Sequence, residues 1–281
     1  MREPALVEND GGGYDSIQTR YLNLLKLSLT RGLDEIHYEV IPPNSRTLLK
    51  RLRYTGYALC QNVLALSHLA LVQTNRPTGE TMMGMGALNN LHSCLDAVYA
   101  DKIPGDFVET GVWRGGGVIF MRAFLAAHSD KTRKVWACDS FRGLPKPSGR
   151  YSADSDDKLW QSEYLAVSLE QVKANFAKYG LLDNQTAFLE GFFSETMPSA
   201  PISEIAVLRL DGDMYESTIV VLEALYAKLS RGGFVIIDDY GMIPACNRAV
   251  DDFRRNVGVT DPLQVIGYVS GKPLGAFWRK S

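Results

Sequence analysis

Residues 207–213, VLRLDGD, form an apolar run that ends in carboxylates, and residues 234–239, FVIIDD, form a second run of the same kind. Such runs are typical of strands that are buried on both faces of a parallel sheet. In open α/β sheets the ligand crevice lies just beyond the carboxyl ends of the strands. Two neighbouring strands ending in Asp211 and in Asp238-Asp239 would therefore place three carboxylates at one crevice. We expect the active site at this crevice.

Strand patterns alternate with helical patterns around these two runs from residue 105 onward. Near the C-terminus, residues 263–269 and 274–279 alternate in polarity on either side of a Ser-Gly-Lys-Pro turn, which is typical of an antiparallel hairpin. Five β-α repeats with this ending predict an α/β fold, a doubly wound, Rossmann-like sheet with a C-terminal antiparallel hairpin. The expected parallel strands cover residues 106–110, 134–138, 186–189, 205–210 and 234–238.

The first hundred residues have a different character. Residues 1–17 are acidic and glycine-rich, and we expect them to form a mobile tail. Residues 18–100 are expected to form a helical cap that contributes to substrate binding and oligomerisation, with helical patterns over about 46–53 and 56–74. The apolar segment 57–72 is short for a membrane span and predicts a buried or interface helix, hence a homodimer or higher homo-oligomer. Residues 101–281 would then form the catalytic domain.

Composition excludes several classes of function. The chain has 281 residues and a net charge of −2, without a run of Lys and Arg, so nucleic acid is not an expected partner. The N-terminus lacks the basic start and apolar segment of a signal peptide. The four cysteines have no C-x-x-C spacing, which favours reduced thiols in a cytoplasmic protein that has no membrane partner.

The turn after the first parallel strand, residues 109–117 (ETGVWRGGG), indicates the cofactor. It is not a G-x-G-x-x-G motif, because Trp113 stands where the second glycine would admit a pyrophosphate. Glu109 would repel phosphates and favour a cationic ligand, and Asp139 ends the next strand, where it could accept both hydroxyls of a ribose. A ligand with a ribose, a positive centre and no phosphate is S-adenosylmethionine. The alternatives to S-adenosylmethionine are a nicotinamide cofactor and a nucleotide-type fold that has lost its ligand.

Four segments together resemble the macrocin O-methyltransferase family, which includes the mycinamicin and noviose O-methyltransferases of antibiotic biosynthesis. They are FVETGVWRGG at 107–116, DSFRGLP at 139–145, LDGDMYES at 210–217 and IDDY at 237–240. The resemblance covers about residues 78–281, whereas residues 36–75 look like an insertion. It implies a class I methyltransferase fold, S-adenosylmethionine, Mg²⁺, and a sugar hydroxyl on a natural product or a nucleotide-activated sugar as the acceptor.

The resemblance also implies roles for individual residues. The Thr81-Met82 loop would fold over the methyl donor, and Gly191-Phe192 would lie near its adenine. Asp211, Asp238 and Asp239 would hold the metal. The complete predicted donor site is Thr81, Met82, Glu109, Thr110, Gly111, Gly115, Asp139, Ser140, Gly191 and Phe192.

The chemistry of methyl transfer to an alcohol requires a stronger nucleophile than a neutral hydroxyl. A divalent cation lowers the pKa of a bound hydroxyl, and a nearby base completes its deprotonation. Asp211 is the expected metal ligand and general base, with Asp213 as the rival base. Helix capping and turn formation are the structural alternative for these aspartates. A nicotinamide-dependent oxidoreductase and a non-catalytic partner subunit are the alternative functions, although such a subunit would gain nothing from keeping all of these acids.

Overall fold

The computed structural model describes residues 16–33, 38–41, 70–73, 79–269 and 271–281. Within these residues the main sheet has seven strands in the order β5-β4-β3-β6-β7-β11-β8. The five strands from β5 to β7 are parallel, and β11 and β8 extend the sheet in antiparallel pairing. The strands are β3 (Asp106–Thr110), β4 (Val135–Asp139), β5 (Thr186–Glu190), β6 (Ile205–Leu210), β7 (Leu229–Ile237), β8 (Gln264–Val265) and β11 (Ala276–Arg279).

This topology confirms the predicted doubly wound α/β fold. The chain enters the sheet at β3 and moves outward through β4 and β5, then returns to the other side of β3 and continues through β6 and β7. The change of direction lies between β3 and β6, and in doubly wound sheets this switch point is where ligands bind. All six residues of β6 are buried, as expected for a central parallel strand covered on both faces.

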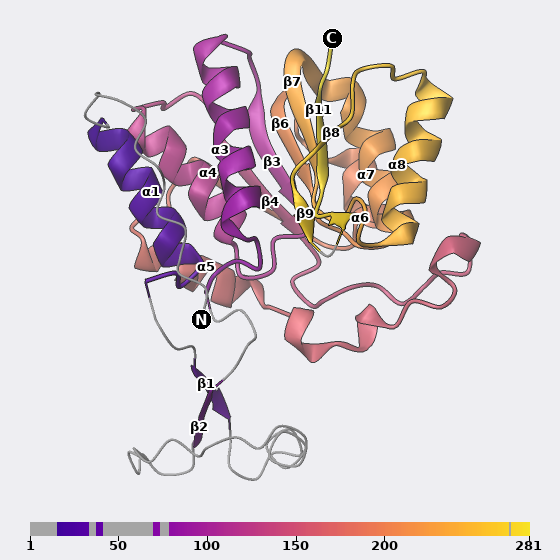
Figure 1. Ribbon diagram of the computed structural model, residues 1–281, viewed down its shortest axis with the longest axis horizontal. Coiled ribbons are helices and arrows are strands. Elements are labelled where there is room, and N and C mark those ends of the chain that lie inside the picture. The colour runs from indigo at the N-terminus through magenta and orange to yellow at the C-terminus, as the bar shows by residue number, and fades with distance from the viewer. Residues whose placement is uncertain (1–15, 34–37, 42–69, 74–78, 270) are drawn as a thin grey trace.

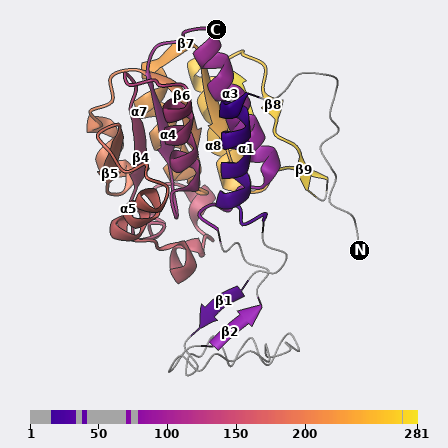
Figure 2. The ribbon, with the colours of Figure 1, turned by 90° about the vertical axis from the view of Figure 1, so that its left-hand side faces the viewer.

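Helices cover the two faces of the sheet (Figures 1 and 2). One face carries α4 and α5, and the other carries α7 and α8, so that each face has its own cluster of buried apolar side chains. The helices are α4 (Gly116–Ala127), α5 (Leu169–Lys178), the short α6 (Phe193–Thr196), α7 (Tyr215–Leu225) and α8 (Pro244–Val257). Short 3-10 turns are η1 (Ser152–Asp154), η2 (Leu159–Gln161), η3 (Glu163–Leu165), η4 (Met197–Ser199) and η5 (Tyr226–Lys228).

Two helices from the first hundred residues join the α4 side of the sheet. These are α1 (Ile17–Leu29) and α3 (Met85–Ala100), whose buried leucines share one apolar core with α4. In both helices these leucines recur every three or four residues, which is the spacing of one buried helix face. Of the predicted mobile tail, residues 1–15 lie outside the described residues, and Ile17 already belongs to α1.

The predicted helix over residues 56–74 is wrong in its last part. Ala70–Gln73 forms strand β2, which pairs in antiparallel register with β1 (Tyr38–Ile41). A short apolar run satisfies helix and strand patterns alike, and here backbone pairing with a segment about thirty residues earlier decides it. Figures 1 and 2 show this two-stranded ribbon apart from the main sheet. The predicted helix over 46–53 and residues 57–69 of the predicted oligomer segment lie outside the described residues.

The predicted C-terminal hairpin is confirmed, in two parts. β8 and β11 extend the main sheet, while β9 (Tyr268–Val269) and β10 (Lys272–Pro273) form a small ribbon of their own. Trp278 of β11 is fully buried in the core on the α7–α8 side of the sheet. In the part of the chain that the structure describes, no helix is long and apolar enough to cross a membrane.

Candidate active site

The ends of β3, β6 and β7 are joined by backbone hydrogen bonds at the switch point. The Asp211 N–H donates to Thr110 O at 2.8 Å, and the Asp238 N–H donates to Leu210 O at 2.9 Å. Backbone pairing therefore continues one residue beyond the ends of β6 and β7. It brings the first residue after β6 and the first after β7 next to each other.

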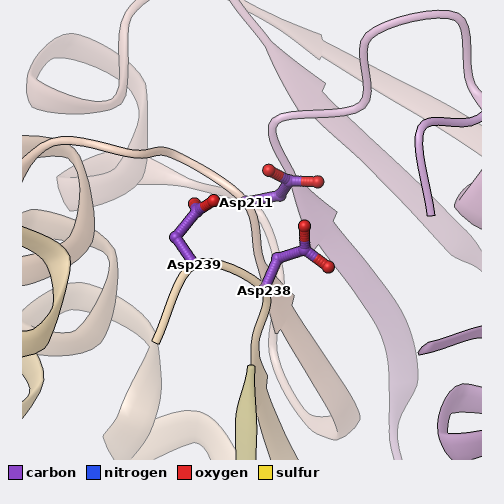
Figure 3. A group of neighbouring side chains, drawn as sticks. All are labelled: Asp211, Asp238 and Asp239. Atoms are coloured by element: carbon purple, nitrogen blue, oxygen red, sulfur yellow. The ribbon is translucent and has the colours of Figure 1, made fainter. Parts of the chain in front are cut away.

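Three aspartates gather at this edge of the sheet (Figure 3). One carboxylate oxygen each from Asp211, Asp238 and Asp239 lies within 4.8 Å of the others. The side chains of Asp211 and Asp238 remain 28% and 30% exposed, so they are accessible from solvent. Hard carboxylate oxygens in such a group suit Mg²⁺. The structure thus brings together the three residues that the sequence singles out as metal ligands.

Arg209 lies beneath these carboxylates and was missed by the sequence analysis. It is 1% exposed and donates to Glu109 Oε1 at 2.5 Å, to Asp211 Oδ2 at 3.0 Å and to Asp238 Oδ1. Glu109 and Arg209 are register partners on β3 and β6, so their side chains emerge side by side on one face of the sheet. The available signal was a single arginine inside an otherwise apolar strand, since a buried charge needs charged partners.

The electrostatics of the cluster follow from burial and crowding of negative charge. Burial raises the pKa of Glu109 to about 7, although the Arg209 guanidinium acts in the opposite direction. Burial and the neighbouring Asp238 carboxylate raise the pKa of Asp211 well above its usual value. Burial and nearby carboxylates also raise the pKa of Asp239, and they bring that of Asp213 to about 6. The carboxylates of the cluster outnumber its one arginine, and this excess of negative charge favours binding of a further cation.

A cavity of about 350 Å³ opens at the switch point and runs from Asp139 to Asp211. Seven of the residues predicted for donor, base or metal line it, namely Met82, Gly111, Asp139, Ser140, Phe192, Asp211 and the rival base Asp213. Seven others do not, namely Thr81, Glu109, Thr110, Gly115, Gly191, Asp238 and Asp239. Glu216 and Ser217, which follow Asp211 along the chain, also line the cavity, as do the apolar residues Trp113, Leu144 and Leu165.

Asp139 is held in place by backbone N–H groups at the end of β4. Its Oδ2 accepts from the Val112 N–H at 2.7 Å, and its Oδ1 accepts from the Phe141 N–H at 2.8 Å. Burial raises the pKa of Asp139, and these hydrogen bonds oppose the rise. Ser140 Oγ also donates to Oδ1, at 3.4 Å. A carboxylate offers about four acceptor positions, so the oriented side chain, which lines the cavity, can still accept a hydrogen bond from a ligand.

The glycine-rich turn owes its glycines to packing of the protein on itself. Gly111 has φ +86°, and a Cβ there would lie 1.6 Å from the carbonyl oxygen of Asp211. A Cβ on Gly117 would lie 2.3 Å from Glu109 Oε1. Only glycine allows the turn to pass this close to β6 and to Glu109. The turn by itself is therefore no sign of a ligand, and the acids around it carry that argument.

Comparison with known proteins identifies the family. Residues 18–280 match the family model described as macrocin O-methyltransferase (TylF). The chain belongs to the macrocin O-methyltransferase family.

Characterised relatives agree with this membership. The 8-demethyl-8-(2,3-dimethoxy-α-L-rhamnosyl)-tetracenomycin-C 4′-O-methyltransferase of Streptomyces olivaceus is 52% identical over 201 residues, covering 71% of this chain and 75% of the relative. The mycinamicin III 3″-O-methyltransferase of Micromonospora griseorubida is 44% identical over 227 residues, covering 77% and 87%. The demethyldecarbamoylnovobiocin O-methyltransferase of Streptomyces niveus is 46% identical over 203 residues, covering 72% and 76%.

A solved structure confirms the fold of this macrocin O-methyltransferase family member. The O-methyltransferase NovP superposes with a TM-score of 0.77 at 38% identity, covering 94% of this chain and 99% of NovP. The calicheamicin methyltransferase CalS11, at 22% identity and a TM-score of 0.53, shares the fold. The chain is thus an O-methyltransferase built on the Rossmann-like sheet predicted from its sequence.

In this member of the macrocin O-methyltransferase family, three of the predicted donor residues that do not line the cavity are linked to residues that do. Thr81 packs against Gly116 of the glycine-rich turn, and its Oγ1 accepts from the Met83 N–H at 3.0 Å. The Gly191 N–H donates to the carbonyl oxygen of Asp139 at 2.9 Å. Glu109 is buried and directed at Arg209. Thr81 is next to Met82 in the sequence, Gly191 bonds to Asp139, and Glu109 shares Arg209 with Asp211; these three neighbours line the cavity.

Proposed function

We propose that this protein is a Mg²⁺-dependent O-methyltransferase that transfers the methyl group of S-adenosylmethionine to a sugar hydroxyl. The acceptor would be an antibiotic glycoside or a nucleotide-activated sugar. The observation that carries this proposal is that Asp211, one of three clustered aspartates, lines the same cavity as Asp139. Three relatives whose names are those of O-methyltransferases acting on antibiotic compounds support the acceptor class.

The end of the cavity near Asp139 suits the donor. Asp139 offers oriented carboxylate oxygens for ribose hydroxyls, and Gly111 offers a wall without a side chain. Phe192 lines the cavity, and the Arg142 guanidinium lies over its ring at 4.5 Å from the ring centre. The other face of the ring would stack on the adenine. Acidic residues at this end favour a sulfonium cation over a phosphate-bearing cofactor.

The other end of the cavity suits a metal and the acceptor. Asp211, Asp238 and Asp239 would hold Mg²⁺, which would supply positive charge that lowers the pKa of an acceptor hydroxyl. Asp211 faces the cavity and is the proposed base that accepts the hydroxyl proton, with Asp213 next to it as the rival. The cavity walls would align the hydroxyl oxygen with the methyl carbon and exclude water, and such alignment is worth roughly 7–11 kcal/mol in favourable cases.

A screen for methyl transfer tests the acceptor class. The purified protein is incubated with S-adenosylmethionine, Mg²⁺ and each of a set of demethylated glycosides and sugar nucleotides, including mycinamicin III and demethyldecarbamoylnovobiocin. Mass spectrometry should detect a mass gain of CH₂ on the sugar, because a methyl group replaces the hydroxyl hydrogen. Tight binding of NAD(P)H without any response to S-adenosylhomocysteine would instead support the oxidoreductase alternative and end this proposal.

Asp211→Asn tests the metal assignment. We expect turnover to fall by at least about a hundredfold, because the substitution removes a metal ligand and the base together. Binding of S-adenosylhomocysteine, measured by calorimetry, should survive because Asp139 is untouched. Excess EDTA should also abolish turnover by the unaltered enzyme, and full activity in EDTA would exclude the metal. Asp213→Asn is the matched control, since it should retain the metal and distinguishes the two candidate bases.

A further inference from the structure

Helix α7 begins directly after the Asp211-Gly212-Asp213 turn, and its N-cap residue does not cap it. Met214 occupies the N-cap position and makes no side-chain hydrogen bond to the helix. A helix start leaves backbone N–H groups without partners inside the helix. At α7 the first two of these N–H groups, on Tyr215 and Glu216, point to a carboxylate from a distant part of the sequence.

That carboxylate is Asp154, 61 residues before Tyr215. Its Oδ1 accepts from the Tyr215 N–H at 2.7 Å, and its Oδ2 accepts from the Glu216 N–H at 2.9 Å. The residue is 2% exposed, so both bonds are shielded from water. A negative charge at a helix N-terminus is also favoured by the helix dipole. Asp154 thus does for α7 what an N-cap residue normally does.

Asp154 belongs to the long connection between β4 and α5, and this connection has other contacts with the cavity wall. Ser148 Oγ donates to Glu216 Oε2 at 2.6 Å, and the Tyr151 ring lies 4.9 Å from the Tyr215 ring between centres. At the other end of the connection, Trp113 Nε1 donates to Tyr164 O at 2.9 Å. Among these contacts, Asp154 supplies the fully buried, charge-assisted pair, the stronger kind of hydrogen bond.

The connection and α7 form adjoining parts of the same cavity wall. Lys146 and Ser148 line the cavity from the connection, and Glu216 and Ser217 line it from the start of α7. Asp211 lies immediately before this part of α7, so this portion of wall borders the site proposed for the acceptor. The donor end is built from the ends of β3, β4 and β5, whereas the hydrogen bonds of the Asp154 carboxylate within the described residues both go to α7.

We propose that Asp154 is a positioning residue for the acceptor sugar: it ties residues 146–165 to the start of α7, and so holds together the acceptor half of the cavity. This rests on the proposed function for the division of the cavity into donor and acceptor ends. Asp154 itself is buried behind the wall and acts through the residues that it positions. Loss of its carboxylate releases the connection from α7 and lowers acceptor affinity, while the donor site remains intact.

Hydrogen–deuterium exchange of the full-length protein tests the positioning directly and needs no acceptor. In Asp154→Ala, peptides covering 146–165 and the start of α7 should exchange at least about ten times faster than in the unaltered protein, since two hydrogen bonds to a charged group are lost. Peptides covering β3 and β4 should be unchanged, as should binding of S-adenosylhomocysteine. Asp154→Asn, which retains one acceptor oxygen, should give an intermediate result. Asp156→Asn, an exposed acid in the same connection, is the control and should have no effect.

Steady-state kinetics test the consequence for the acceptor, using whichever glycoside the screen above shows to be methylated. We expect Asp154→Ala to raise KM for the acceptor at least about tenfold with a much smaller change in kcat. This pattern indicates the loss of an interaction that stabilises the bound substrate and the transition state equally. Unchanged exchange over 146–165, or an equal loss of protection in β3 and β4, would overturn the proposal. An unchanged acceptor KM would do the same. If the unaltered enzyme methylates none of the compounds, the proposed acceptor class fails, and the exchange result still decides whether Asp154 holds the wall.

Discussion

Replacing Arg209 by methionine is the sharpest perturbation of the carboxylate cluster. Methionine is unbranched, uncharged and shorter than arginine, so it removes the guanidinium while filling part of its volume. Glu109, Asp211 and Asp238 would then lose their shared cationic partner. The loss is not compensated by solvent at Glu109, because that carboxylate is 2% exposed.

The expected effect on stability is large. Removing one partner of a buried ion pair typically costs about 3–5 kcal/mol, because the remaining charge is left without compensation. For a protein of this size the loss corresponds to a fall in Tm of roughly 6–20 °C. Arg209→Lys keeps the charge but lacks the planar fork that reaches three carboxylates, so its effect should be smaller, about 1–3 kcal/mol. Arg231→Met, at an exposed position on β7, is the control and should remain within about 0.5 kcal/mol.

Urea unfolding and differential scanning calorimetry in EDTA measure these changes. Added Mg²⁺ provides a second test, because it brings positive charge to the same carboxylates. It should raise the Tm of Arg209→Met by more than it raises that of the unaltered protein. A loss below about 1 kcal/mol, or one equal to that of Arg231→Met, would show that Arg209 is not the counter-charge of the site.

Two further predictions concern the pH dependence of stability and the glycine-rich turn. Because the pKa of Glu109 rises from 4.5 to about 7 on folding, the native state holds a proton that the unfolded chain releases, so stability in EDTA should fall as pH rises through this window. Urea unfolding at several pH values measures this fall in the free energy of unfolding. Glu109→Gln should make the fall less steep. A free energy of unfolding that increases over the same pH window would contradict the burial argument. Gly111→Ala should prevent folding to soluble protein, since its Cβ would overlap the Asp211 backbone. Gly149 has a similar φ of +80°, and a Cβ there would have no described atom within 4 Å. Gly149→Ala should therefore lower the free energy of unfolding by only about 1–2 kcal/mol. Equal soluble yields and Tm values for the two variants would refute the packing argument.

The metal-site candidates were predictable because the end of a buried strand can be recognised from the local sequence, as the point where an apolar run gives way to polar residues. An apolar run ending in Asp211 and another ending in Asp238 must place both acids at one edge if the strands are neighbours. The same reasoning located Asp139 at the end of its strand. Arg209 was missed because two of its three partners, Glu109 on β3 and Asp238 after β7, come from other strands. One of them, Glu109, is 100 residues away, and periodicity within one segment cannot reveal such a pairing.

Asp154 escaped the sequence analysis for a related reason. It lies in a long polar connection, and polar residues in a connection are expected to be solvated. Nothing near it in the sequence shows that α7, which begins 61 residues later, has a methionine at its N-cap position that cannot cap it. The last part of the helix expected over residues 56–74 failed in the same way, since pairing of Ala70–Gln73 with Tyr38–Ile41 is a long-range property.

The sequence by itself determined the class of fold, the order of its strands along the chain and the family, because each depends on local hydrophobic patterns and contiguous motifs. Tertiary structure decided which acids face the cavity and which face Arg209, since a side chain's partners depend on strand order and register. It placed Glu109 behind the wall and Asp211 within it. It also assigned the glycines of the first turn to packing, because the Asp211 backbone passes too close to Gly111 for any side chain.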